Sequence, residues 1–138
     1  MHCRLARLPK VGLNATSTSE GLNMPKVYRE ITRSVSASLA KLRVDTPDVM
    51  KGFSALADAA MRDGALDKKT KELIALALGV AGHCDACLGF HLKTLVKLGA
   101  TRAEVEEALG VAVYMGGGPS LMYAADALAA FEELSAPG

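Results

Sequence analysis

At 138 residues and a formal net charge of +1, the chain is expected to fold as one domain, and its basic residues are scattered among acidic ones without forming a nucleic-acid footprint. Half of the residues are hydrophobic but only 4% are aromatic, so the core must be built mainly from Ala, Leu, Val and Met, which favours helices. The longest apolar run, Leu73 to Gly82, is well short of the roughly 20 residues that span a bilayer, and no membrane segment is expected.

Residues 1 to 24 differ from the rest of the chain. Basic residues are followed by the polar stretch Asn14 to Ser19, with no helical period and no sustained apolar segment. We interpret these residues as a mobile tail outside a single helical domain that occupies residues 25–138. Because Met24 directly precedes the first periodic segment, translation could also begin there. Cys3 lies in the tail and, without a positioned electropositive setting, is not expected to be catalytic.

The first two predicted helices are marked by apolar periodicity and by a proline. From Pro25 to about Val44, apolar residues recur every three or four positions, which gives a helix one apolar face. These residues are Val27, Ile31, Val35, Leu39 and Leu42. A second helix is predicted to run as far as Gly64, with Thr46 as its N-cap and Pro47 at its first position.

The next two predicted helices stand on either side of a turn that contains glycine. Asp67 is placed to cap a third helix, whose charged first turn gives way to an apolar run from Leu73. A fourth helix is predicted to begin around His83 or Cys84 and to stop at Gly99, a residue type that suits the position just after a helix.

The last part of the chain predicts two further helices. Thr101 and Glu104 form a capping box at the start of a fifth helix. The segment Met115 to Ser120, MGGGPS, predicts a break, and Pro119 suits the start of a sixth helix that reaches about Leu134. No stretch alternates with a period of two residues. The sequence therefore predicts an all-α fold of about six helices joined by short turns.

Thiols and an imidazole share one predicted helix face. Cys84, Cys87 and His91 are three and four residues apart, so on a helix that begins at Cys84 they project from the same side. Two thiols at this spacing can form a redox disulfide, the helix terminus stabilises a thiolate, and an imidazole can accept the thiol proton. Cys84 has the better helix-terminus position, whereas Cys87 is one turn from His91. We favour Cys87 as the activated thiol and Cys84 as its partner.

Glu72 is an isolated carboxylate in the apolar run that precedes the cysteines. Along one continuous helix it would lie roughly 18 Å from Cys84, too far to act with it. If the chain reverses at Ala81–Gly82, however, the two helices form an antiparallel hairpin and the position opposite Glu72 is that of His91. A carboxylate at this level can orient the imidazole ring and hold its proton. The hairpin is therefore the predicted carrier of the active site.

Each of these residues also has a purely structural interpretation. Glu72 could be an exposed helix charge, His91 a half-buried structural histidine, and the cysteines small core residues. A zinc site would draw on Cys84, Cys87, His91 and His83. One Cys-x-x-Cys pair without a second ligand pair is a poor match to four-coordinate structural zinc, so we expect no metal and no other cofactor.

The spacing of Glu72, Cys84, Cys87 and His91, written E-x11-C-x-x-C-x3-H, resembles the carboxymuconolactone decarboxylase superfamily, specifically its alkylhydroperoxidase D-like branch. The likeness covers roughly Pro25 to Leu134. It implies an all-helical fold that assembles into homo-oligomers, commonly trimers or hexamers. It also implies a catalytic role for these four residues in a thiol-disulfide activity that reduces peroxides or regenerates a peroxiredoxin partner, with dihydrolipoamide-type compounds as reductants.

One position departs from the pattern of the branch. Its well-known members carry a histidine directly before the second cysteine, where this chain has Ala86, so the relay has one imidazole fewer unless His83 replaces it. Decarboxylase members of the superfamily are the rival enzyme interpretation, although they do not depend on a Cys-x-x-Cys pair. A non-catalytic helical assembly module with buried cysteines is a third interpretation.

Composition adds two expectations about the environment of the protein. A small monomer has little interior in which to bury so much apolar surface, so part of that surface is expected to be covered in an oligomer. Three cysteines do not make a secreted disulfide framework. A Cys-x-x-Cys pair without a secretory signal indicates a reducing compartment, and we expect the cytoplasm.

Overall fold

Five helices make up most of the described chain, residues 26–137 of a computed structural model. They are α1 Tyr28–Asp45, α2 Pro47–Met61, α3 Lys68–Ala81, α4 Asp85–Lys97 and α5 Arg102–Ser135. The all-α prediction is confirmed. The predicted tail and its Cys3 lie outside the described residues, and the domain boundary at residue 25 stays a prediction. No helix within the described range is long and apolar enough to cross a bilayer.

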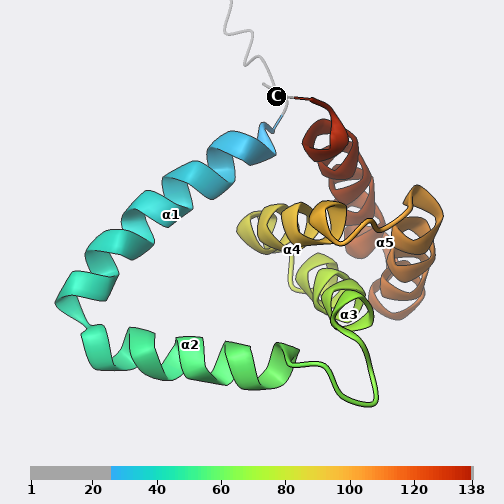
Figure 1. Ribbon diagram of the computed structural model, residues 1–138. Helices are drawn as coiled ribbons and strands as arrows, with labels where there is room; N and C mark the ends of the chain where they lie inside the picture. Colours follow the sequence, from blue (N-terminus) through green and yellow to red (C-terminus); the bar gives the residue numbers. More distant parts are fainter. Residues whose placement is uncertain (1–25, 138) are drawn as a thin grey trace, which may run out of the picture.

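The core lies where α3, α4 and α5 pack against one another, with the first turns of α1 lying against α4 (Figure 1). Most of its aliphatic side chains are fully buried, and each large one contributes roughly 1.5–3 kcal/mol of burial free energy. The largest of them are Leu76, Val80, Leu88, Leu92, Leu95 and Val105. Gly89 allows the close contact of α4 with α1, because a Cβ atom there would lie 2.6 Å from Cγ2 of Thr32. This core holds α3 and α4 side by side.

The second half of α1 and the whole of α2 project from this core as an extended arm, residues 36–61 (Figure 1). The apolar face predicted for the first helix is partly buried at Ile31 and Val35 but exposed at Leu39 and Leu42. In α2 only Met50 is buried. The prediction of an apolar face is therefore correct, but the described residues leave most of that face uncovered.

The predicted break in the segment 115–120 is present as a kink inside α5. Gly117 has φ 68° and ψ −152°, a backbone conformation that only glycine adopts readily, and Pro119 follows two residues later. Gly116 has no space for a side chain, because a Cβ atom would lie 2.0 Å from Oγ of Ser120. The two helices predicted on either side of this segment are therefore present as the two halves of α5, which meet at Gly117.

Helix ends follow the predicted local signals in most places. The Asp67 carboxylate accepts a hydrogen bond of 2.7 Å from the Thr70 N–H. Hydrogen bonding to the Thr70 side chain and to this N–H lowers the pKa of the carboxyl group. The capping box of Thr101 and Glu104 is formed, and Gly99 takes its position after α4 with φ 69°. These predictions are confirmed.

Two helix ends differ from the prediction. α1 begins at Tyr28 rather than at Pro25, and α2 ends at Met61 rather than at Gly64. No side chain next to α1 caps its first turn. The carboxylate of Glu133, near the end of α5 and far away in the sequence, caps the helix instead. It accepts hydrogen bonds from the N–H groups of Tyr28 at 2.8 Å and Arg29 at 3.0 Å. A local pattern cannot reveal a cap of this kind.

Candidate active site

The turn between α3 and α4 brings the predicted site together. After Ala81 the chain reverses through a Schellman arrangement, in which Cys84 N–H donates to Gly79 O at 3.0 Å and His83 N–H donates to Val80 O at 3.1 Å. His83 takes the left-handed position of this motif, with φ 53°, where glycine is the usual residue. The predicted reversal is confirmed, and the turn between the two helices comprises residues 82–84.

Cys84 and Cys87 are joined by a disulfide at the start of α4, with their Cα atoms 5.2 Å apart. Cys84 is the N-cap of the helix, and its Sγ accepts a hydrogen bond of 3.2 Å from the Cys87 N–H. α3 passes close behind the pair at Gly79, where a Cβ atom would lie 3.3 Å from Cβ of Cys87. The helix terminus and its dipole therefore act directly on the sulfur of Cys84.

Glu72 and His91 face each other across the hairpin. Oε2 of Glu72 lies 2.7 Å from Nδ1 of His91, and Glu72 is only 6% exposed. The predicted register is confirmed, and the interpretation of Glu72 as an exposed helix charge is wrong. An ionised carboxylate only accepts hydrogen bonds, so Nδ1 carries the proton and Nε2 keeps a lone pair that can accept one. His91 is one turn beyond Cys87 on the same face of α4.

An ion-pair network at the start of α4 was not foreseen from the sequence. Nζ of Lys26 donates to Oδ1 of Asp85 at 2.8 Å and to Oδ2 of Asp126 at 2.7 Å. The bonds to Asp126 and Asp85 raise the pKa of Lys26 above its usual range. Lys26 therefore stays cationic and offsets the charge of Asp85, which directly follows Cys84. These residues are 59 and 100 positions apart from Lys26, so no local pattern links them.

The same network reaches His83 through an aromatic ring. Tyr123 stacks on the imidazole of His83 with ring centroids 4.7 Å apart and an interplanar angle of 24°. Nζ of Lys26 lies 4.8 Å from the Tyr123 centroid. The ring of His83, directly before Cys84, is thus held by α5 and not by the Glu72–His91 pair.

Tyr28 lies next to this network and is buried, and its hydroxyl has no hydrogen-bond partner among the described residues. Burial is the main cause that raises the pKa of Tyr28 to about 12.

Within residues 26–137, no three or more His, Cys, Asp or Glu side chains gather as a metal site would require. The arrangement is suited to two-electron exchange between a dithiol and a disulfide, with an oriented imidazole for proton transfer.

Comparison with known proteins relates this geometry to one family. The model of the carboxymuconolactone decarboxylase family matches residues 47–130. An uncharacterised protein of Cupriavidus necator is 44% identical over 90 residues, 65% of this chain and 80% of that protein. Uncharacterised protein 4 in the cox locus of Paracoccus denitrificans is 34% identical over 113 residues, 82% of this chain and 95% of that protein.

Solved structures agree with the sequence matches. The crystal structure of a carboxymuconolactone decarboxylase family protein from Legionella pneumophila, in its apo form, has a TM-score of 0.78 and 64% identity, and the match covers 79% of this chain and 97% of that one. A protein from Thermotoga maritima has a TM-score of 0.63 and 33% identity, with 78% and 91% covered. The fold, the matched residues and these relatives show that the chain belongs to the carboxymuconolactone decarboxylase family.

Proposed function

We propose that the protein is a thiol-disulfide oxidoreductase of the alkylhydroperoxidase D-like branch, which reduces hydroperoxides with Cys84 and Cys87 and serves antioxidant defence. The observation that supports this proposal is the hydrogen bond between Glu72 and His91 on the hairpin that also carries the disulfide. The buried carboxylate of Glu72 accepts a hydrogen bond from Nδ1 of His91, which leaves Nε2 of the ring to act as a base. That base lies one turn from Cys87.

Peroxide reduction begins with the dithiol form. His91 takes the proton of Cys87 through Nε2, and the thiolate attacks one oxygen of the peroxide. The O–O bond breaks, the leaving alkoxide takes the proton from His91 and departs as an alcohol, and Cys87 becomes a sulfenic acid. The Cys84 thiol then attacks that sulfur, water leaves, and the disulfide forms. Two thiols and one hydroperoxide thus give one disulfide, one alcohol and one water.

A reductant must then restore the dithiol, and we propose a dihydrolipoamide-type compound. Its thiolate attacks Sγ of Cys87 and forms a mixed disulfide, while Cys84 leaves as a thiolate. The N–H of Cys87 and the start of α4 stabilise that leaving group, and a stabilised thiolate leaves faster. The second thiol of the donor completes the exchange. The disulfide of a peroxiredoxin partner is an alternative oxidant for the same thiol pair.

We also propose that the chain works as a homo-oligomer, a trimer or hexamer. Large apolar side chains of the arm are exposed in a single chain, among them Val44, Val49, Phe53 and Leu56. The arm also contains an apolar groove of about 480 Å³ between α1 and α2. Exposed apolar surface of this extent is typical of a protein interface. A second copy is the proposed cover.

A thiol titration tests the redox assignment. In a Cys3→Ser background, one equivalent of hydrogen peroxide is expected to remove two thiols per chain, and a dihydrolipoamide-type dithiol is expected to restore both. Cys87→Ser is expected to abolish peroxide consumption. Cys84→Ser is expected to keep the first step and to form a stable mixed disulfide with an added thiol near pH 7.

The same titration separates the rival functions. A decarboxylase that does not use the thiols, or a helical assembly module with buried cysteines, would keep both thiols after peroxide treatment. If the parent chain and both Cys→Ser variants react neither with peroxide nor with thiol reagents, the redox assignment is refuted.

A further inference from the structure

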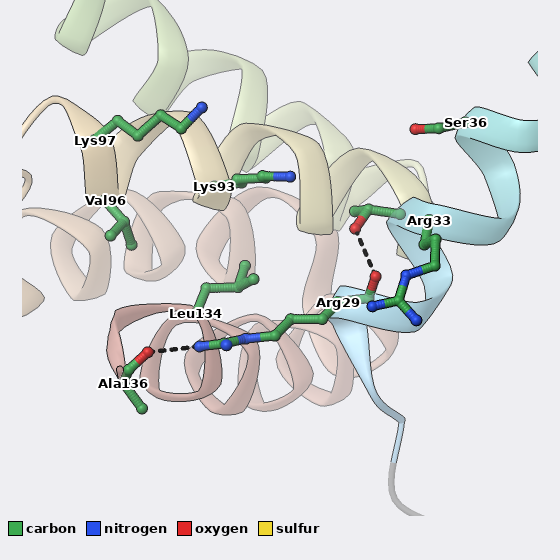
Figure 2. Close-up of a pocket in the computed structure, with 9 residues that line it drawn as sticks. Arg29, Arg33, Ser36, Lys93, Val96, Lys97, Leu134 and Ala136 are labelled. Carbon is green, nitrogen blue, oxygen red and sulfur yellow. Dashed lines mark hydrogen bonds between the residues drawn. The ribbon is translucent and has the colours of Figure 1, made fainter. Parts of the chain in front are cut away.

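An open cavity of about 570 Å³ lies between α1, α4 and the end of α5 (Figure 2). Its charged lining is entirely basic, with Arg29 and Arg33 one turn apart on α1 and Lys93 and Lys97 one turn apart on α4. No aspartate or glutamate of the described part of the chain lines it. Like charges one turn apart on a helix repel each other, so the chain by itself gains no stability from this arrangement.

The basic side chains lack carboxylate partners within the described part of the chain. Arg29 donates to the backbone carbonyl oxygens of Glu133 and Ala136. The side chains of Arg33, Lys93 and Lys97 form no ion pair with any residue between 26 and 137. The carboxylate of Glu133 is already engaged by two backbone N–H groups at the start of α1. Among the described residues, at least three cations therefore surround the cavity without a counter-charge.

The rest of the lining limits the kind of ligand. Val96 and Leu134 contribute apolar surface beside the basic groups, as Figure 2 shows. The volume lies in the range of roughly 300–1,000 Å³ that is common for small-molecule sites. A guanidinium recognises the planar or tetrahedral oxyanion of a carboxylate or phosphate, and an ammonium adds a point charge.

We propose that this cavity binds a small organic anion with at least two negative charges and a compact apolar body, such as a phosphate ester or a dicarboxylate. Arg33 and Lys93 approach the anion from the two opposing helices. Lys97 adds charge, and Arg29 is held in place by its carbonyl partners. Val96 and Leu134 cover the apolar part of the ligand.

This site is separate from the redox pair. Lys93 is six residues beyond Cys87, which places it about 9 Å further along α4 and about 240° around its axis. The cavity therefore opens on another side of the helix from the disulfide. The proposal does not depend on thiol chemistry, and binding can be measured whatever the redox assignment proves to be.

Calorimetric titration with inorganic pyrophosphate and with succinate, at constant ionic strength and with potassium chloride as the reference, tests the proposal. At least one of the two anions is expected to bind the full-length chain saturably. Arg33→Gln combined with Lys93→Gln is expected to weaken that binding at least about tenfold, because each charged hydrogen bond contributes about that factor. Arg62→Gln combined with Lys68→Gln, which removes the same charge from exposed positions outside both the cavity and the arm, is expected to change it less than about twofold.

Two further measurements keep the test decisive. Arg33→Lys combined with Lys93→Arg preserves both charges and is expected to retain binding within a few-fold. Absence of saturable binding to the unmodified chain, or equal weakening by the two charge-removing pairs, would overturn the proposal. Light scattering tests the alternative that carboxylates of a second copy fill the cavity. If Arg33→Gln with Lys93→Gln changes the subunit count while no anion binds, a second copy is the occupant and the small-anion site is rejected.

Discussion

Glu72 is buried in an apolar part of α3, and His91 is its one hydrogen-bond partner among residues 26–137. A buried carboxylate is stable only where it is paired, and the same pairing fixes which nitrogen of the ring carries the proton. Glu72 is thus a positioning residue: it acts on the thiols through the imidazole. This role depends on the antiparallel approach of α4.

Glu72→Gln is expected to lower the rate of peroxide reduction at least about tenfold near pH 7, because the amide does not fix the ring with Nδ1 protonated. The pH profile of thiol reactivity is expected to shift to higher pH, a change that a purely structural role would not produce. Stopped-flow measurement of peroxide consumption checks both. Glu107→Gln, an exposed charge of α5, is the matched control, and equal rates for the two variants would contradict the role of Glu72.

Tyr28 predicts a pH dependence of stability. Its pKa is raised from 10.0 to about 12, so the folded chain holds the proton more tightly than the unfolded chain does. The corresponding stability is fully present below about pH 10 and is lost as the pH rises towards about 12. Tyr28→Phe is expected to flatten the decline of the denaturation midpoint over this interval.

At neutral pH the same variant has a second expected outcome. Because the hydroxyl of Tyr28 has no partner among the described residues, Phe is expected to leave stability unchanged or to raise it by up to about 1 kcal/mol. Urea unfolding at pH 7 measures this difference. A loss of more than about 1 kcal/mol would show that the hydroxyl makes a hydrogen bond after all.

At the scale of elements, the kink of α5 depends on one backbone conformation. Gly117→Ala places a side chain at φ 68° and is expected to destabilise the fold by about 1–3 kcal/mol, as judged by the midpoint of thermal or urea unfolding. Gly110→Ala is the matched control, since nothing lies within 4 Å of a Cβ atom there, and it is expected to stabilise the helix by up to about 1 kcal/mol. Equal effects of the two substitutions would mean that the kink is not required.

At the scale of the whole molecule, the arm is a surface on which exposed apolar side chains gather. Phe53 and Leu56 are 65% and 66% exposed in a single chain. Changing both to Asp is expected to lower the mass of the assembly in light scattering to that of a smaller oligomer or monomer, while α3, α4 and α5 stay folded by circular dichroism. Glu107→Lys, on an exposed charged position of α5 outside the arm, is the control. An unchanged mass for the double variant would reject the arm as the interface.

The sequence by itself determined what depends on neighbours in the chain. Helix caps at Asp67 and Thr101, the glycine after α4 and the register of the α3–α4 hairpin could all be predicted, because each follows from residues within about twenty positions. The facing of Glu72 and His91 belongs to this group. It required only a short reversal and the regular rise of two helices.

Only the tertiary structure decided which distant residues surround the site. Lys26 meets Asp85 and Asp126, Tyr123 stacks on His83, and the basic cavity combines α1 with α4, because helix packing brings together residues that no period in the sequence relates. The apolar face of the first helix shows the same limit. Periodicity predicts that a face is apolar, but whether the core, the arm or another chain covers it depends on the direction in which the helix leaves the core.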